Sequence, residues 1–242
     1  MISRTAVRVE AGGVLDHLYC TPPLTLRRIA GDRDSCALCL VGTAAGPLPG
    51  DDLHLSLRLG SRARASLSAA GASIAQGGGA PMPSRLSVSA ALGPGAQLEA
   101  DPGAVVVCSG ARVDLSVSIQ LADDAAIQWR ELVVLGRTGE AAGAVTLRWE
   151  VQRGGSPLLR QFVDLRDPRF AAWPGLVAGA RVMASELISA PDVQARTLVR
   201  SRTCVAAQLD AHSMLLTVLG DDAAQVGAEV AALRESVLEC TG

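Results

Sequence analysis

The sequence lacks lysine and asparagine altogether, and all 22 of its basic residues are arginine. The formal net charge is −2 and the arginines are scattered, so no basic stripe is available to hold a phosphate backbone. We therefore expect no nucleic-acid partner. Aromatic residues make up only 2% of the chain, whereas hydrophobic residues make up 49%. This composition argues against disorder and predicts a core built from Val, Leu and Ala.

Long apolar runs are also absent. The segment 176–188 is too short to span a bilayer and contains Arg181 and Glu186. The first ten residues carry Arg4, Arg8 and Glu10 and no continuous apolar stretch, which does not fit a signal peptide. We expect a cytoplasmic protein with no membrane partner.

The residues that usually form metal or redox sites are few and poorly spaced. The six cysteines, at positions 20, 36, 39, 108, 204 and 240, form no compact disulfide framework, so we expect thiols. Cys36 and Cys39 have the CxxC spacing, but on a strand residues three apart point to opposite faces. The three histidines (His17, His54 and His212) show no HxH or HExxH spacing, and His54 is predicted to be a surface residue.

Alternating apolar residues predict a repeated β structure. Four strands begin at positions 53, 86, 115 and 145, which are 33, 29 and 30 residues apart. A turn follows each strand, and the next apolar positions are Leu67, Leu98, Ile127 and Leu158. Such periods are typical of stacked units that bury their apolar faces against their neighbours. An antiparallel meander with regular hairpins would give similar spacing.

We therefore predict an all-β fold, with a layered β-helical, solenoid-like or sandwich body of repeated strands. Residues 1–242 are expected to form one domain. Further strands are predicted in residues 1–30 and 35–41. The unbroken apolar run 104–108 predicts a strand that is covered on both faces. Residues 69–84, rich in Gly and Pro, predict a mobile insertion that could order on a partner. An amphipathic helix is expected at about 221–239, with an apolar stripe at positions 226, 230, 233, 237 and 238.

Neither phosphate-binding nor hydrolytic chemistry has clear support. The Gly-rich segment 42–52 lacks a GK[ST] ending and precedes a strand, so a structural turn is the better interpretation. Asp51-Asp52 and Asp123-Asp124 are the kind of acids that a glycosidase uses, but both pairs lie in predicted turns. Glu99 and Glu131 stand beside strand residues. If buried, each would need a cation, which Arg112, Arg130 or Arg137 could supply.

An ordered series of short motifs resembles the family of urease accessory proteins called UreD, or UreH in some bacteria. The series is Pro23-Leu24, Arg27, Gly46 to Gly50-Asp51 before a Leu-x-Leu-x-Leu strand, Gly95-Ala96-x-Leu98-Glu99, Asp101-Pro102, Gly110-Ala111, Glu131 and Gly136-Arg137. Leu216-x-Val218-Leu219 and a helix with Leu233-Arg234 also fit. The family usually has Gly-Gly where this chain has Ala45-Gly46. It also has a Thr-rich segment ending in a tyrosine where this chain has residues 69–76, so the chain resembles a divergent member.

The resemblance implies a non-enzymatic scaffold with a largely β-helical body and no tightly bound cofactor. It implies binding to a UreF-like accessory protein, through it to a UreG-like GTPase, and to the urease apoprotein, in a possible dimeric heterocomplex with nickel in transit. Asp51, Asp52, Glu99, Arg130, Glu131 and Arg137 are then candidates for a polar conduit or for family-motif roles. The alternatives are a carbohydrate-active β-helix enzyme using turn aspartates and a β-solenoid binding module for a small ligand.

Overall fold

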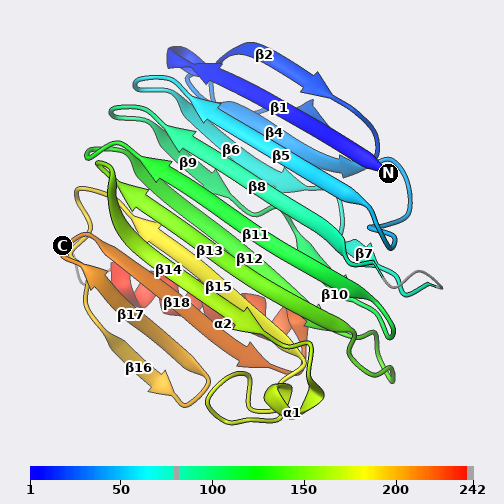
Figure 1. Cartoon of the computed structure of the whole chain (residues 1–242). Helices are drawn as coiled ribbons and strands as arrows, with labels where there is room; N and C mark the ends of the chain where they lie inside the picture. Colours follow the sequence, from blue (N-terminus) through cyan, green and yellow to red (C-terminus); the bar gives the residue numbers. More distant parts are fainter. Residues whose placement is uncertain (79–81, 239–242) are drawn as a thin grey trace.

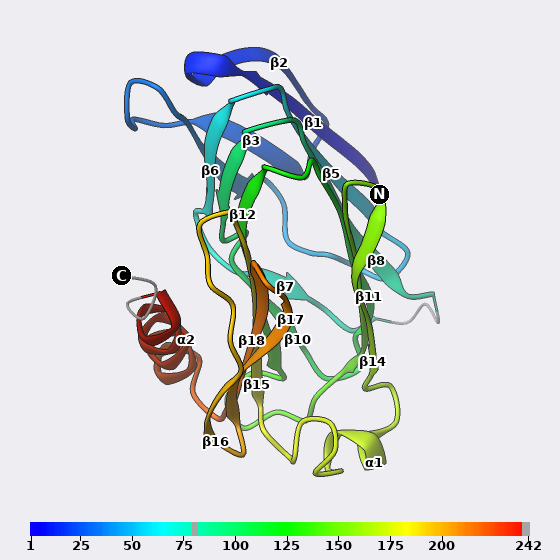
Figure 2. The same ribbon diagram turned by 90° about the vertical axis from the view of Figure 1, so that its left-hand side faces the viewer.

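The computed structural model describes residues 1–78 and 82–238, which form two facing β-sheets with a helix outside one of them (Figures 1 and 2). Sheet A contains, in spatial order, β14 (Ser156–Asp164), β13 (Ala144–Arg153), β11 (Arg112–Leu121), β8 (Ser84–Leu92), β5 (Asp52–Leu59), β1 (Ile2–Glu10) and β2 (Val14–Cys20). A 3-10 turn, η1 (Ala11–Gly13), joins β1 to β2.

Sheet B contains, in spatial order, β16 (Leu198–Ser201), β17 (Cys204–Asp210), β18 (Ser213–Gly220), β15 (Val182–Ser189), β12 (Ala126–Leu135), β9 (Gln97–Ala100), β6 (Arg64–Ala69), β4 (Cys36–Gly42) and β3 (Leu24–Arg28). Two short strands extend it, because β10 (Ala104–Val107) pairs with β12 and β7 (Ser73–Ala75) pairs with β10. The helices are α1 (Pro168–Ala171) and α2 (Ala223–Leu238).

The chain coils through these sheets, giving a strand to sheet A and then one to sheet B. Strands β5, β8, β11 and β13 are parallel neighbours in sheet A, and β6, β9 and β12 are parallel neighbours in sheet B. Parallel pairing of strands some 30 residues apart is what a coil of stacked units requires. The structure therefore confirms the predicted layered β body with a C-terminal helix, in its solenoid-like form.

The register confirms most of the predicted repeat and corrects part of it. Leu53, Leu86 and Leu115 are aligned in adjacent strands, and all point inward. Two predicted positions were wrong by two residues, because Leu147 and not Val145 aligns with Leu115, and Ala65 and not Leu67 aligns with Leu98. The regular coil ends after β13, since β14, which contains Leu158, pairs with β13 in antiparallel orientation within the same sheet.

Two other segments differ from their predicted structure. Residues 69–84 are not simply an insertion, because they supply β7 to sheet B; residues 79–81 of this segment lie outside the described residues. In the run 104–108, Val105, Val107 and Cys108 are buried, whereas Ala104 and Val106 are only partly buried. The alternation shows that one face of β10 is fully covered and the other only in part.

The C-terminal helix forms where its apolar stripe predicted it. The Asp222 carboxylate accepts a hydrogen bond from the Gln225 backbone N–H at 2.9 Å, which caps the first turn. The buried face packs on β15, β17 and β18 and consists of Val226, Val230, Leu233 and Val237. The core therefore has two parts, one between the sheets and one under α2.

Candidate functional site

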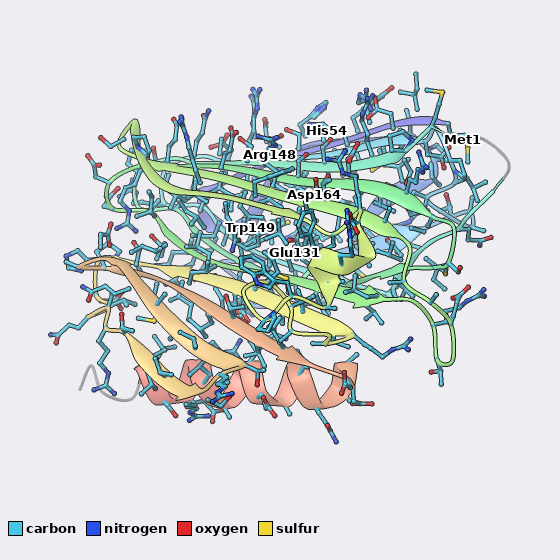
Figure 3. The ribbon with its side chains drawn as sticks, turned by 60° about the horizontal axis from the view of Figure 1, so that its bottom comes forward. Met1, His54, Glu131, Arg148, Trp149 and Asp164 are labelled. Atoms are coloured by element: carbon cyan, nitrogen blue, oxygen red, sulfur yellow. The ribbon has the colours of Figure 1, made fainter. Side chains whose placement is uncertain are left out.

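Glu131 points from β12 into the space between the two sheets. It has the same inward phase as its neighbours Trp129 and Val133, which are fully buried. Trp149 of β13, in the opposite sheet, donates a hydrogen bond from Nε1 to Glu131 Oε2 at 2.8 Å (Figure 3). The carboxyl group is thus held from across the interior by a neutral donor.

This environment changes the acidity of Glu131. Burial raises the pKa of the carboxyl group from 4.5 to about 7, and the hydrogen bond from Trp149 opposes that rise. A carboxyl group with a pKa near 7 exists in both protonation states at physiological pH. The interior therefore contains a group that can gain or lose a negative charge.

A small cavity lies beside Glu131 and adjoins a larger pocket. The cavity, about 40 Å³, is lined by Glu131 and Trp129 together with mostly apolar residues of both sheets. An outer pocket of about 320 Å³ is formed largely by parts of the segments 42–46 and 69–76. Leu24, Leu40, Ser73 and Pro102 line both spaces, so the two are neighbours. The outer pocket thus involves the two segments in which the sequence departs from the UreD pattern.

Arg130 does not pair with Glu131, because the alternation of side chains along β12 places Arg130 on the outer face of sheet B. There it binds Glu186, a fully buried acid of β15, with its Nε 2.9 Å from Oε2. Arg234 of α2 reaches the other oxygen of Glu186 at 3.2 Å, and Arg130 also lies 3.3 Å from Asp101. These four side chains form a charge cluster that joins β12, β15 and α2.

Arg112 and Arg137 do not pair with Glu99 or Glu131 either. Glu99 is exposed on the outer face of β9, because its inward neighbours are Leu98 and Ala100. Arg137 is exposed and paired with Glu140 at 2.9 Å. Arg112 is also exposed. The structure therefore brings neither Glu99 nor Arg137 to Glu131.

The turn interpretation is confirmed for Asp123 and Asp124, but Asp52 is the first residue of β5 and Asp51 directly follows a turn at residues 49–50. Asp51 is buried and accepts a hydrogen bond from the Leu48 N–H at 2.8 Å as well as one from the Met1 amine, while Asp52 pairs with Arg4 at 2.8 Å. Asp124 accepts a hydrogen bond from the Gly95 N–H at 2.9 Å.

The two aspartate pairs lie at opposite ends of the sheet, since one stands at the start of β5 and the other follows the parallel strand β11. Eight residues of strand separate such ends by roughly 25 Å. They cannot act together on one glycosidic bond.

The described residues offer no other metal or redox constellation. Within residues 1–78 and 82–238, no group of three or more His, Cys, Asp or Glu side chains is placed to hold a metal ion. The five cysteines in these ranges are free, with Cys36 buried and Cys39 partly buried. His54 is half-buried and not fully on the surface, and its ring nitrogens lie 2.8 Å from Ser87 Oγ and 3.2 Å from Ser89 Oγ.

Two important side chains were missed from the sequence. Glu186 lies in β15, where every residue is buried. An acid inside such a buried run is the sequence signal that could have identified it. The donor to Glu131, Trp149, had no local signal because its contact crosses between sheets. No helix among the described residues is long and apolar enough to cross a membrane.

The fold and the site define a two-sheeted β-solenoid with an acid, Glu131, on the inner face of sheet B. Comparison with known proteins identifies the family. The family model described as UreD urease accessory protein matches residues 3–240, so the chain belongs to the UreD family.

Similar proteins have the same family name. Urease accessory protein UreD 1 of Saccharopolyspora erythraea is 37% identical over 78% of this chain and 77% of its own length. Urease accessory protein UreD of a Parafrankia species is 32% identical over 91% and 86% of the two chains. Urease accessory protein UreD 3 of Streptomyces griseus is 31% identical over 88% and 86%.

Proposed function

We propose that this protein is a non-enzymatic scaffold for urease maturation. In this role it binds the urease apoprotein and a UreF-like accessory protein, and through the latter a UreG-like GTPase, so that nickel reaches the urease active site. The proposed setting is the cytoplasm, and nickel is cargo and not a resident cofactor. The observation that carries the proposal is the family match across residues 3–240.

The interior cavity supports a part in handling the cargo. A carboxylate oxygen is a suitable ligand for a divalent cation, and Glu131 places one in a small cavity that adjoins a larger pocket. A single carboxylate holds such an ion weakly, which suits passage better than storage. Protonation of Glu131 would compete with the cation.

The test is co-expression of urease subunits and accessory proteins with and without this chain. We expect the complete set to yield urease with several-fold more bound nickel, measured by metal analysis of the purified enzyme. Unchanged nickel content when this chain is omitted would refute the scaffold role.

The role of Glu131 is tested separately with Glu131→Gln, which keeps a hydrogen-bond acceptor but loses the charge. We expect several-fold less nickel on urease while the accessory complex still co-purifies. Glu150→Gln, on the exposed outer face of β13, is the matched control and should behave like the wild type. Full nickel loading with Glu131→Gln would show that the cavity has no part in nickel delivery, and it would not contradict the scaffold role.

A further inference from the structure

Half of the outer face of sheet B is uncovered by the described chain. α2 packs against β15, β17 and β18, which form one side of the sheet. The outer faces of β4, β6 and β9, on the other side, have no such layer among the described residues (Figure 2). The sheet therefore changes from a covered to an open surface near β12.

This open surface is the floor of a broad groove. A row of aligned residues crosses it from strand to strand, and consists of Ala37, Ser66, Glu99 and Gln128. One wall is the segment 29–35 before β4, and the other includes residues 190–193 and Leu238 at the end of α2. Because the side chains of Ala37 and Ser66 are short, a partner element could approach the sheet closely over β4 and β6.

The walls carry apolar side chains. Ile29 is 46% exposed on one wall. Leu238, half-buried at the end of α2, lines the opposite wall. A partner that fills the groove could therefore place apolar side chains against both walls.

The charges in the groove favour a basic partner. The charged side chains that line it are four acids and two arginines, namely Asp32, Asp34, Glu99, Asp192, Arg33 and Arg64. All four acids are exposed. Arg64 donates from Nε to Gln97 at 3.0 Å, so its guanidinium is held along the sheet. The groove thus has an excess of negative charge, with Glu99 on its floor and the other three acids on its walls.

We propose that this groove binds a basic amphipathic α-helix of the UreF-like accessory protein, and this inference rests on the proposed function. A helix fits because the floor is a sheet face whose backbone groups are already paired, so strand addition is unavailable. α2 shows that the outer face of sheet B packs against a helix. The bound helix lies beside α2 and extends the same layer, with apolar residues toward the walls and basic residues toward the acids.

The first test is site-specific photo-crosslinking in the complex of the full-length proteins. A photoreactive amino acid replaces Ser66 on the groove floor, and a matched one replaces Ser118 on the outer face of sheet A. We expect the Ser66 position to crosslink to one segment of the UreF-like protein that is helical and net basic, and the Ser118 position not to. Crosslinking to an acidic or neutral segment, or equal crosslinking from both positions, would overturn the proposal.

The second test reverses the charge of the groove with the double variant Glu99→Arg/Asp192→Arg. We expect the dissociation constant for the UreF-like protein to rise at least tenfold. Glu229→Arg is the control, because Glu229 is an exposed acid of α2 on the side of Cys204 in β17, away from the groove.

The two hypotheses fail in different ways. Normal affinity of the double variant, with correct folding shown by circular dichroism, would overturn the groove proposal and leave the scaffold function intact. If wild-type protein does not bind the UreF-like protein at all, both the groove proposal and the proposed function are wrong.

Discussion

Glu131 shows how far a strand pattern can predict the environment of one side chain. The alternation of Trp129, Glu131 and Val133 places the acid on the inner face once the phase of β12 is known. The pattern also predicts that a buried acid needs a partner, but it favours a cation. The structure supplies the Trp149 N–H in its place, since β13 crosses to the opposite sheet. Contacts of this kind depend on how the coil closes and cannot be predicted from strand spacing.

The raised pKa of Glu131 makes stability depend on pH. Burial raises the pKa to about 7 in the folded state, against an ordinary value of 4.5 when unfolded, so the folded protein binds more protons between these values. Ionisation of Glu131 therefore lowers the free energy of unfolding as the pH rises from about 4.5 to about 7, by roughly 3 kcal/mol at most. Above that range both states are ionised and the contribution is constant.

We expect Glu131→Gln to remove this dependence. The free energy of unfolding of the variant minus that of the wild type should increase between pH 5 and pH 8, measured by denaturant titration at each pH. Glu150→Gln, a change at an exposed acid, gives the background dependence. A constant difference across the range would show that Glu131 ionises normally.

Two neighbouring glycines separate the effect of backbone conformation from that of crowding. Gly12 and Gly13 both have positive φ, at 71° and 67°, but a Cβ at Gly12 would meet nothing within 4 Å, whereas one at Gly13 would lie 2.7 Å from the Ser35 backbone. Gly12→Ala should cost about 1 kcal/mol for the left-handed conformation. Gly13→Ala should cost about 1 to 3 kcal/mol more because of the clash. Equal unfolding free energies for the two variants would contradict this account.

The attachment of α2 combines an apolar stripe with a buried charge. The stripe could be predicted from its helical spacing, and the cap from Asp222. The charge cluster could not, because the partners of Glu186 lie 56 and 48 residues away in sequence. Arg130 and Arg234 hold both oxygens of an acid that has no exposure to water. The cluster therefore fixes where α2 sits on the sheet.

Removing this acid should weaken both the fold and the docking of α2. We expect Glu186→Ala to lower the free energy of unfolding by about 3 to 5 kcal/mol, because two arginines lose a buried partner. Hydrogen exchange of the α2 amides should rise more than that of β11. The control Glu150→Ala breaks an exposed pair with Arg148 at 3.8 Å and should cost less than about 1 kcal/mol. A similar small cost for both variants would mean that the cluster adds little.

Part of the fold of the whole chain could be predicted from the repeat in its sequence. Strand positions and spacing predicted the coil because inward apolar residues recur in phase across β5, β8 and β11. Parallel pairing could not be separated from a meander, since both give the same alternation. The repeat also fails after β13, where the antiparallel strand β14 begins a different topology. A pattern can predict the unit, but it cannot show where stacking stops.

Exposed aromatic residues point to association as a property of the complete molecule. The chain has three tryptophans, two phenylalanines and one tyrosine, and only Trp129 and Trp149 are buried. Phe162, Phe170 and Trp173, from β14 and the α1 region, are 52%, 48% and 57% exposed. Large exposed aromatic side chains favour interfaces with partners and self-association without them.

We therefore expect the isolated protein to associate with itself at high concentration, through this aromatic segment and not through the groove beside α2. Phe170→Ser/Trp173→Ser should lower the sedimentation-average mass at high concentration toward that of a monomer. The double variant Asp32→Ser/Asp34→Ser, in the groove wall, is the matched control and should associate at least as much as the wild type, since it removes charge. Sedimentation of all three proteins over the same concentration range decides between the surfaces. Association that persists with the aromatic side chains removed would contradict this assignment, because the apolar contact that drives it would then lie elsewhere.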